Sequence, residues 1–345
     1  MNRKEFIKRA GVMTLGTSLL PMLGYSQNEV SHFIGQEVDT PKRDYDVIII
    51  GGSYAGLATA LTSVRCLRNV LLIDAGKPRN RFAEKAHNGI LLDGIAPAEV
   101  QKIATEQLHP YQSYLDKLND EVVEVRKDEN GFRVTTKNSG ESKASYLVFA
   151  TGATDELPDI KGIAEQWGKN VHHCPYCHGF ESRKGKTLLL SNNFQGLELL
   201  GSLQHWSEQL IVALQTEMDV PAQLQEFMDK QSIKWTKQKV IEVRSRQDGT
   251  LKEVAYKDGH TEEVDHIYLK PKTTYQTLLA EKLGCAIDKS QRITTDDFML
   301  TSQPGVYAVG DVSAKSMGQI IWAANSGMMA GVHINNQMIA NSIQK

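Results

Sequence analysis

The sequence predicts an α/β protein made of two Rossmann-like three-layer domains. A buried strand, a glycine-containing turn, a helix and a second strand follow one another over residues 44–74. Two further buried strands, 187–190 and 209–214, lie in the middle of the chain, and a strand, a turn and a helix occupy 305–331. Strands that alternate with helices favour parallel sheets that are covered by helices on both faces.

The composition is that of a globular protein. The chain has 345 residues, of which 41% are hydrophobic and 23% charged, enough for two domains with cores of their own. A net charge of −2 gives no indication of nucleic-acid binding. Four cysteines are too few for a disulfide scaffold, and two of them, Cys66 and Cys285, are expected to be buried apolar residues.

The N-terminal residues predict a leader that is separate from the fold. Residues 1–11 are basic and residues 12–24 form a short apolar run, followed by small residues at a cleavage site, Gly24 and Ser26. Together, residues 1–26 predict a signal peptide and residues 27–42 a polar linker. The protein is therefore expected to be exported to the periplasm.

Two export routes remain open for this leader. Residues 3–8, Arg-Lys-Glu-Phe-Ile-Lys, resemble the twin-arginine (Tat) signal, with Lys4 in place of the second arginine. Tat carries folded proteins, which suits a protein that loads its cofactor before export. The alternatives are an ordinary Sec signal, an amphipathic membrane anchor, or a protein that stays in the cytoplasm.

The first motif predicts a dinucleotide site. Strand 44–50 runs into the turn 51–56, then a helix from residue 57 to about 66 and a strand 69–73. Glycines permit a tight turn, and the helix N-terminus offers N–H groups to a pyrophosphate. The candidate cofactor-binding residues are Gly51, Ser53, Tyr54, Ala55, Gly56 and, for the ribose, Asp74. Ser53 replaces the middle glycine of the usual motif.

Two later segments specify the cofactor as FAD. A buried strand ends in Ala-Thr-Gly at residues 150–152, a step common in flavoprotein disulfide reductases, after a β-meander over 121–137. Residues 305–311 look like the second FAD motif, and a helix over 319–331 would point its N-terminus at the flavin. These segments add the candidates Thr151, Gly152, Gly310, Asp311, Gln319 and Ile320.

Over residues 42–339 the chain resembles the low-molecular-weight thioredoxin reductases, most closely their dithiol oxidase branch. The resemblance implies an FAD domain that is split in sequence, residues 43–156 and 287–345. It also implies a central NAD(P)-binding-like domain, 157–286, that carries the C-x-x-C pair, and a homodimer.

The run Cys174–Gly179 predicts a redox-active pair, because two cysteines at this spacing can close and reopen a disulfide. The resemblance implies that Cys177 is the charge-transfer thiolate against the flavin and that Cys174 exchanges with substrate. We expect His178 to be the acid/base that moves the thiol proton, with Glu181 orienting it. His172 and His173 are expected to be core or solvated histidines.

Other chemistry fits the same run. Cys174–His178 matches the C-x-x-C-H attachment site of c-type haem, but its flanks predict a flavin fold. A zinc site from these cysteines and histidines lacks a second ligand pair at a familiar spacing. No metal is therefore expected.

The central domain departs from an NADPH site. After strand 187–190, residues 191–196 read Ser-Asn-Asn-Phe-Gln-Gly, without the first two glycines of the motif. No Lys, Arg or His lies between Ile211 and Asp229 to bind a 2′-phosphate, although Glu217 could reach the ribose of NADH. NAD(P)H is therefore a doubtful cofactor, and NADPH is not a periplasmic currency.

These features predict a dithiol:disulfide oxidoreductase that relays two electrons between the cysteine pair and FAD, working as a thiol oxidase. The substrate is a small dithiol or a thioredoxin-like protein, and oxygen or another acceptor takes the electrons. One alternative is an NAD(P)H-dependent thioredoxin-disulfide reductase. Another is a non-catalytic redox-sensing flavoprotein.

Overall fold

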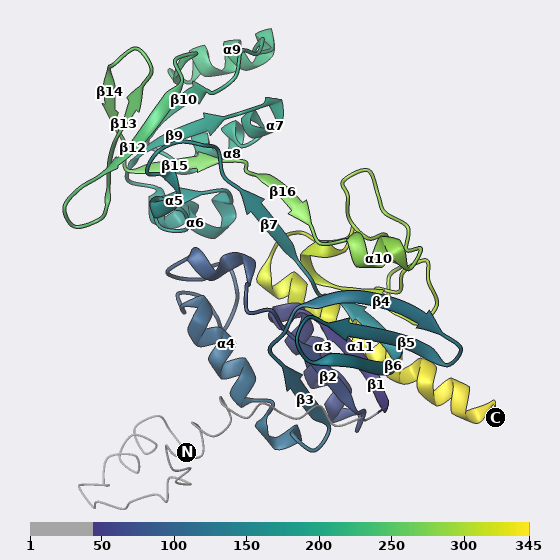
Figure 1. Ribbon diagram of the computed structural model, residues 1–345. Coiled ribbons are helices and arrows are strands. Elements are labelled where there is room, and N and C mark those ends of the chain that lie inside the picture. Colours follow the sequence, from purple (N-terminus) through teal and green to yellow (C-terminus); the bar gives the residue numbers. More distant parts are fainter. Residues whose placement is uncertain (1–43, 345) are drawn as a thin grey trace, which may run out of the picture. The chain divides into compact units, whose positions relative to one another are not determined.

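The computed structural model describes residues 44–344 (Figure 1). The predicted signal peptide and the whole of the predicted linker lie outside these residues. Within them, no helix combines the length and the apolar character that crossing a bilayer requires.

The first sheet has seven strands and mixed direction. Its order is β3 (Leu115–Leu118), β2 (Val70–Ile73), β1 (Asp44–Ile50), β6 (Gly140–Phe149), β5 (Gly131–Thr136) and β4 (Val122–Asp128). Strands β1, β2, β3 and β6 pair in parallel, whereas β4, β5 and β6 form the expected antiparallel meander. β17 (Val306–Ala308) pairs in parallel with the last residues of β6, so the C-terminal segment completes this sheet.

Two helices lie together on one face of this sheet. α3 (Tyr54–Arg65) and α11 (Ile320–Ile343) approach so closely that a Cβ on Gly327 would lie 2.1 Å from the carbonyl oxygen of Ala55. The shorter helices of this part are α4 (Pro97–Glu106), α10 (Leu278–Lys282), η1 (Arg79–Phe82), η2 (His109–Tyr111) and η3 (Gly310–Val312).

Alternating residues of β1 enter two hydrophobic cores, as the period of a strand requires. Val47 and Ile49 face the helix side with Ala60 of α3, and Ile48 faces the opposite core with Phe132. Each is fully buried, apart from the 4% exposure of Phe132. A strand that is buried on both faces explains the unbroken apolar run that predicted it.

The middle of the chain forms a second, all-parallel sheet. Its order is β11 (Lys234–Thr236), β10 (Gln209–Leu214), β9 (Lys186–Ser191), β15 (His266–Leu269) and β8 (Val171–His172). The helices of this part are α5 (Ile163–Gln166), α6 (Pro175–Ser182), α7 (Phe194–Leu197), α8 (Leu200–Trp206) and α9 (Ala222–Lys230). A separate antiparallel sheet holds β12 (Val240–Ser245), β13 (Leu251–Tyr256) and β14 (Thr261–Glu263).

A two-stranded antiparallel ribbon joins the segments that carry these sheets. β7 (Ala153–Glu156) leads out of the first sheet and β16 (Lys272–Tyr275) leads back beside it (Figure 1). Ala280 and Cys285 already belong to the core around β1 and β6. The chain has therefore rejoined that core before residue 287, where the sequence analysis placed the boundary.

The α/β prediction is confirmed, with differences at the element ends. α3 begins at Tyr54, three residues before the expected start at 57, because the turn residues already adopt helical geometry. α11 continues to Ile343 rather than ending at 331, since residues 332–343 contain no glycine or proline to stop it. Cys66 is only partly buried, whereas Cys285 is buried as expected.

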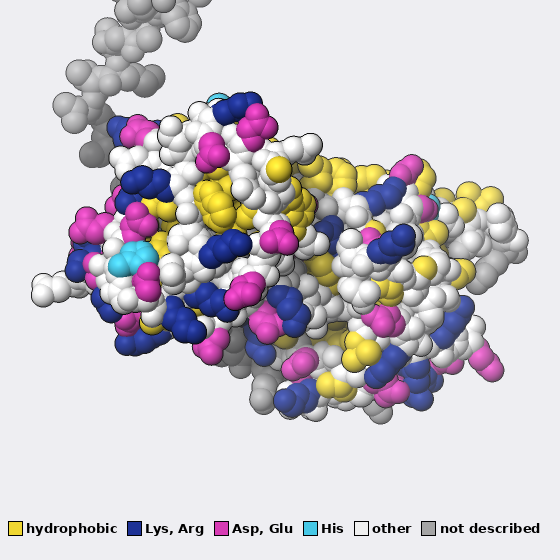
Figure 2. Space-filling view, turned by 90° about the horizontal axis from the view of Figure 1, so that it is seen from above, with side chains coloured by type: hydrophobic (Ala, Val, Ile, Leu, Met, Phe, Trp, Pro, Cys, Tyr) yellow, Lys and Arg dark blue, Asp and Glu magenta, His cyan; other side chains and the backbone are white. Residues whose placement is uncertain are grey.

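The surface mixes both signs of charge. Figure 2 shows Lys and Arg side chains interspersed with Asp and Glu, and a hydrophobic patch near the middle of the same face. This distribution agrees with a net charge close to zero.

Candidate functional site

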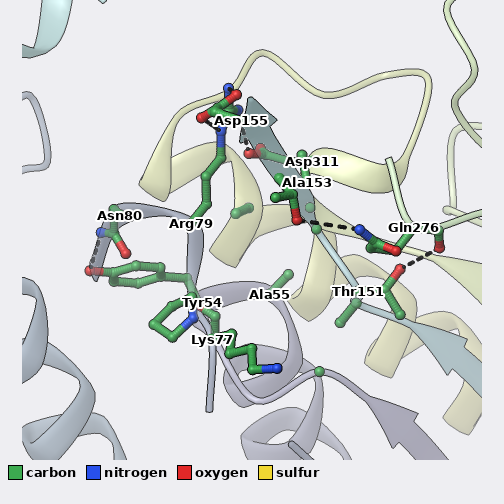
Figure 3. Close-up of a pocket in the computed structure, with 18 of the residues that line it drawn as sticks. Tyr54, Ala55, Lys77, Arg79, Asn80, Thr151, Ala153, Asp155, Gln276 and Asp311 are labelled. Atoms are coloured by element: carbon green, nitrogen blue, oxygen red, sulfur yellow. Dashed lines mark hydrogen bonds and ion pairs between the residues drawn. The ribbon is translucent and has the colours of Figure 1, made fainter. Parts of the chain in front are cut away.

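A cavity of about 740 Å³ runs from the β1–α3 turn to the C-x-x-C segment (Figure 3). Of the predicted cofactor-binding residues, the cavity is lined by Gly51, Ser53, Tyr54, Ala55, Asp74, Thr151, Gly152, Gly310, Asp311, Gln319 and Ile320. Gly56 is not at the cavity wall. Instead, it lies under the turn, where a Cβ would be 1.8 Å from the carbonyl oxygen of Gly51.

The turn fits a pyrophosphate because its glycines have no side chains and it lines the cavity at the start of α3. The first N–H groups of a helix have no partners within the helix and can bind an anion. Gly51 has φ +109°, and a Cβ there would lie 2.2 Å from the carbonyl oxygen of Ala150. A Cβ on Gly52 would lie 2.7 Å from that of Asp74, so the carboxylate sits directly against the turn. Ser53 caps α3 without a side-chain hydrogen bond, and no acidic residue occupies the first turn. These residues fit an anionic dinucleotide.

The second half of the cavity is built by segments distant in sequence. Thr151 Oγ1 donates to the carbonyl oxygen of Gln276 at 3.0 Å, which ties the end of β6 to the segment after β16. Gly310 has φ +69°, and its N–H donates to Ser326 Oγ at 2.9 Å. This bond holds η3 against α11 and leaves Asp311 at the cavity wall.

Arg79 joins two carboxylates in the same cavity. Its Nε lies 2.7 Å from Asp155 Oδ2, and its Nη1 lies 3.0 Å from Asp311 Oδ2 (Figure 3). Burial opposes charge on Asp155, but the hydrogen bonds and positive charge of Arg79, together with a hydrogen bond from Thr273, lower the pKa of that carboxyl below its ordinary value. Arg79 therefore connects η1, the ribbon strand β7 and the second FAD motif.

Cys174 and Cys177 form a disulfide at the start of α6, with Cα atoms 5.3 Å apart. Cys174 is the N-cap, Pro175 occupies the first turn, and the Cys177 N–H donates to the carbonyl oxygen of Cys174 at 3.2 Å. Cys177 lines the cavity. A helix N-terminus stabilises a thiolate, so this position favours opening of the disulfide.

Gln319, the N-cap of α11, contacts this disulfide. Its Nε2 lies 3.6 Å from the Sγ of Cys174 and 3.6 Å from the Sγ of Cys177. Its Oε1 accepts a hydrogen bond from Asn88 Nδ2 at 3.2 Å. The two redox sulfurs therefore meet both α6 and the N-terminus of α11.

A group of histidines surrounds His178. The rings of His172 and His178 stack with centroids 4.1 Å apart, and the His87 ring lies edge-on to His178 at 6.3 Å. His172 is buried, and His266 lies beyond it at 6.3 Å. The Nδ1 atoms of His172, His178 and His266 are buried and find no hydrogen-bond partner in residues 44–344.

Burial keeps these rings neutral. Burial and the neighbouring His87 lower the pKa of His178 to about 4, although Glu181 opposes the shift. Burial also lowers the pKa of His173 to about 4, and that of His172 well below its ordinary value. At neutral pH, His178 is therefore an uncharged imidazole that can accept a proton.

The Glu181 carboxylate lies close to His87, whose ring is a neighbour of His178. Its Oε1 is 3.7 Å from His87 Nδ1, and Asp93 Oδ1 is 3.5 Å from the same nitrogen. The segment 87–94 contributes His87 to the cavity wall, while Ile90 and Leu91 are 80% and 90% exposed.

Sequence reasoning missed several residues that line the cavity, namely Lys77, Arg79, Asn80, Asp155 and Gln276. Asn80 donates to the Tyr54 hydroxyl at 3.1 Å (Figure 3). The basic segment 77–81, which follows the ribose-binding candidate Asp74 closely, was the one signal that could have pointed to Arg79.

No group of three or more His, Cys, Asp or Glu side chains in residues 44–344 is arranged to hold a metal ion. The stacked histidines present ring faces to one another, which is unsuited to a shared ligand.

The central nucleotide motif is closed by its own side chains. Asn193 Oδ1 accepts from the Gly196 N–H at 3.0 Å, and Ser191 Oγ donates to the Asn193 carbonyl oxygen at 2.7 Å. The helix that follows, α7, has only four residues, and Phe194 in it is 51% exposed. A phosphate would have to displace the Asn193 side chain to reach the Gly196 N–H.

Comparison with known proteins gives one consistent result. The family model described as pyridine nucleotide-disulphide oxidoreductase matches residues 45–327. Thioredoxin reductase sirT of Leptosphaeria maculans is 28% identical over 316 residues, covering 86% of this chain and 94% of that protein. Thioredoxin reductase aclD of Aspergillus oryzae is 28% identical over 310 residues, covering 85% of this chain and 96% of that protein.

Solved structures agree with the sequence relatives. An oxidoreductase from Agrobacterium tumefaciens is 31% identical with a TM-score of 0.79, covering 86% of this chain and 99% of that one. The structure of HlmI is 27% identical with a TM-score of 0.82, covering 87% of this chain and 94% of that one. A putative thioredoxin reductase TrxB from Bacillus anthracis is 26% identical with a TM-score of 0.81, covering 86% and 99%.

Proposed function

Because the chain belongs to the pyridine nucleotide-disulphide oxidoreductase family and is a thioredoxin reductase-like FAD oxidoreductase of thiol and disulfide groups, we propose that it is a dithiol oxidase. The observation that carries this proposal is the Cys174–Cys177 disulfide, which meets the cavity at Cys177. The far end of the same cavity is the β1–α3 turn, which fits a dinucleotide.

FAD would be held by the turn, by Asp74 and by the second motif around Asp311. When bound, it would supply a two-electron acceptor for the cysteine pair, with oxygen as the proposed final acceptor. The chain's own part is thiol–disulfide exchange. A substrate thiolate attacks Cys174 Sγ, a substrate–Cys174 bond forms, the Cys174–Cys177 bond breaks, and Cys177 keeps the electron pair as a thiolate.

The second substrate thiol then displaces Cys174 and closes the substrate disulfide. His178, neutral and beside Cys177 in sequence, accepts the thiol proton. The net reaction converts one dithiol and one oxygen molecule into one disulfide and one hydrogen peroxide.

Closure of the central motif supports electron entry from thiols rather than from NAD(P)H. The Gly196 N–H that would face a pyrophosphate already bonds to Asn193. No basic residue lies between Ile211 and Asp229 for a 2′-phosphate. Charge-assisted hydrogen bonds are worth about 1.5–3 kcal/mol each, so losing several lowers NADPH affinity by orders of magnitude.

We also propose an exported, dimeric protein. The leader pattern of residues 1–26 supports export to the periplasm, where a thiol-driven enzyme needs no nicotinamide. Dimer formation is supported by an apolar stripe on α11 whose members are 44–79% exposed: Met328, Val332, Ile339 and Ile343. Their spacing of four, seven and four residues sets them along one side of the helix.

The test is the visible spectrum of the mature protein under anaerobic conditions, first with NADPH and NADH and then with a dithiol. Bleaching of the flavin by the dithiol alone, reversed by air with hydrogen peroxide release, supports the oxidase. A Cys177→Ser variant should stay yellow and lose the thiol-driven bleaching. Bleaching by NADPH or NADH would overturn the proposed direction.

The second candidate function is an NAD(P)H-dependent thioredoxin-disulfide reductase. It is favoured by the names of the curated relatives, thioredoxin reductases sirT and aclD. Nicotinamide-driven reduction of a thioredoxin-like protein would select it.

A further inference from the structure

The amide of Gln319 bridges the redox disulfide and the loop that begins at His87. Nε2 donates toward both sulfurs at 3.6 Å, while Oε1 accepts from Asn88 Nδ2 at 3.2 Å. An amide has one donating and one accepting end. With its oxygen bonded to Asn88, the amide presents its N–H end to the sulfurs.

Asn88 is itself held in place. Its N–H donates to Asp93 Oδ1 at 2.9 Å, and the loop is closed by the bridge between Ala86 and Ile95. Asn88 has φ +59°, a left-handed conformation that asparagine tolerates better than most residues. The side chain that orients Gln319 thus comes from a loop with its own hydrogen bonds.

The contact matters when the disulfide opens. The electron pair of the broken bond goes to Cys177 Sγ, and that sulfur gains a negative charge in a partly buried site. A hydrogen bond to a charged acceptor is about twice as strong as one between neutral groups. An N–H donor at this position therefore stabilises the open state more than the closed one.

We propose that Gln319 is a catalytic residue of thiol–disulfide exchange, whose amide stabilises the sulfur charge that develops on Cys177, and that Asn88 is its positioning residue. The inference rests on the proposed function only in requiring that the pair opens and closes. It holds for either direction of electron flow, because the same bond breaks in both.

The experiment measures the thiol pKa of Cys177 directly. In a Cys174→Ser, Cys66→Ser background of the FAD-loaded protein, the rate of Cys177 alkylation by iodoacetamide is followed against pH, with the labelled peptide identified by mass. Cys285 is buried and serves as an internal slow-reacting thiol. The groups around Cys177, namely His178, His87 and Glu181, stay the same in every variant.

Gln319→Leu should raise the pKa of the Cys177 thiol by about one unit, a roughly tenfold loss of thiolate at fixed pH. Asn88→Gly, which suits the left-handed backbone, should give a smaller rise in the same direction. Gln337→Leu, on the exposed part of the same helix, should leave the pKa unchanged. Gln319→Glu places an acceptor beside the sulfur and should raise the pKa further.

An unchanged Cys177 pKa in Gln319→Leu would overturn the proposal, as would an equal shift in Gln337→Leu. FAD content of each variant is read from its visible absorbance, so a shift caused by cofactor loss is recognised. If dithiols fail to bleach the wild-type flavin, the oxidase proposal falls, yet the Gln319 result is unaffected.

Discussion

The imidazole rings of His172 and His178 stack at 4.1 Å with 15° between their planes. His172 is 5% exposed and lies on β8, whereas His178 lies in the second turn of α6. The stack therefore joins the central sheet to the helix that carries the cysteines. It holds the His178 ring through ring contact, and the Nδ1 atom of that ring has no hydrogen-bond partner in residues 44–344.

We expect His172→Phe to retain dithiol oxidation and His172→Ala to lose much of it. A phenyl ring preserves the stack, whereas alanine leaves a gap and lowers the free energy of unfolding by about 1–3 kcal/mol. Steady-state rates and urea unfolding check both variants. Equal losses in the two variants would show that the ring nitrogens of His172 matter, and the positioning role would fall.

His178→Gln should slow thiol-driven flavin reduction roughly 100-fold or more at pH 7, the usual contribution of a positioned acid or base. The low pKa of His178, about 4 in the disulfide form, does not prevent this role. Opening the disulfide puts a thiolate on Cys177, which lines the same cavity as His178, and a nearby negative charge raises the pKa of an imidazole.

The matched control for His178 is Glu181→Gln, one turn further along α6. Glu181 is 43% exposed and lies 3.7 Å from His87, so its loss should change the rate only slightly. Stopped-flow reduction by a dithiol separates the two variants. Retention of the full rate in His178→Gln would assign the proton transfer to another group.

Stability should fall as the pH decreases from about 6.5 to about 4. His173 and His178 have pKa values of about 4 in the folded protein against 6.5 when unfolded. Within this window the unfolded state binds more protons, so lowering the pH favours unfolding. Each histidine contributes about 1.4 kcal/mol per pH unit, and above pH 6.5 its contribution is constant.

Urea unfolding at several pH values checks this dependence. His178→Gln should remove one histidine's share of the slope between pH 6 and pH 4.5. It should leave the behaviour above pH 7 unchanged. A slope equal to that of the wild type would mean that His178 titrates normally in the folded protein.

The elements that the sequence predicted well are those set by local pattern. The strand 44–50 and its turn follow from an unbroken apolar run and from glycines whose backbone positions leave no room for a Cβ, such as Gly51. Likewise, the apolar run in 209–214 predicts a strand with the observed bounds, and its last five residues are buried.

The contacts that surround the chemistry could not be predicted in this way. Gln319 was selected for its place at a helix start, but its side chain reaches sulfurs 142 and 145 residues away. Arg79 meets Asp155 across 76 residues and Asp311 across 232. Such pairs depend on the return of the chain through the β7–β16 ribbon, and no local spacing encodes them.

Arg79→Gln should destabilise the protein by about 3–5 kcal/mol, because it leaves two carboxylates without their buried partner. The side chains of Asp155 and Asp311 are only 5% and 20% exposed. The Arg79→Gln, Asp155→Asn double variant should recover part of the loss, since it removes one unpaired charge. Arg81→Gln is the control, because Arg81 is exposed and its hydrogen bonds within residues 44–344 go to backbone carbonyls of its own loop.

Thermal unfolding of the wild type, Arg79→Gln, Asp155→Asn and the double variant completes a double-mutant cycle. If the losses from Arg79→Gln and Asp155→Asn simply add, the two residues do not interact and the bridge carries no stability. The flavin content measured alongside shows whether the cavity wall depends on this bridge as well.

Gly327→Ala should lower the free energy of unfolding by about 1–3 kcal/mol, the usual effect of inserting a methyl group where no space exists. A Cβ at this position would lie 2.1 Å from the carbonyl oxygen of Ala55 and 2.9 Å from Thr59 Oγ1. The Ala55 oxygen belongs to the backbone of α3 and cannot move without the helix. The variant therefore has to push α11 away from the helix whose N-terminus forms the dinucleotide turn.

Gly201→Ala is the matched control, because it is also a helical glycine but its Cβ would meet nothing within 4 Å. It should stabilise the protein by about 0.4–1 kcal/mol through the reduced freedom of the unfolded chain. Urea unfolding should therefore show that a Gly→Ala substitution lowers the free energy of unfolding at position 327 and raises it at position 201. If Gly327→Ala were neutral or stabilising, the close contact between α3 and α11 would be wrong, and with it the packing that holds the turn against the second FAD motif.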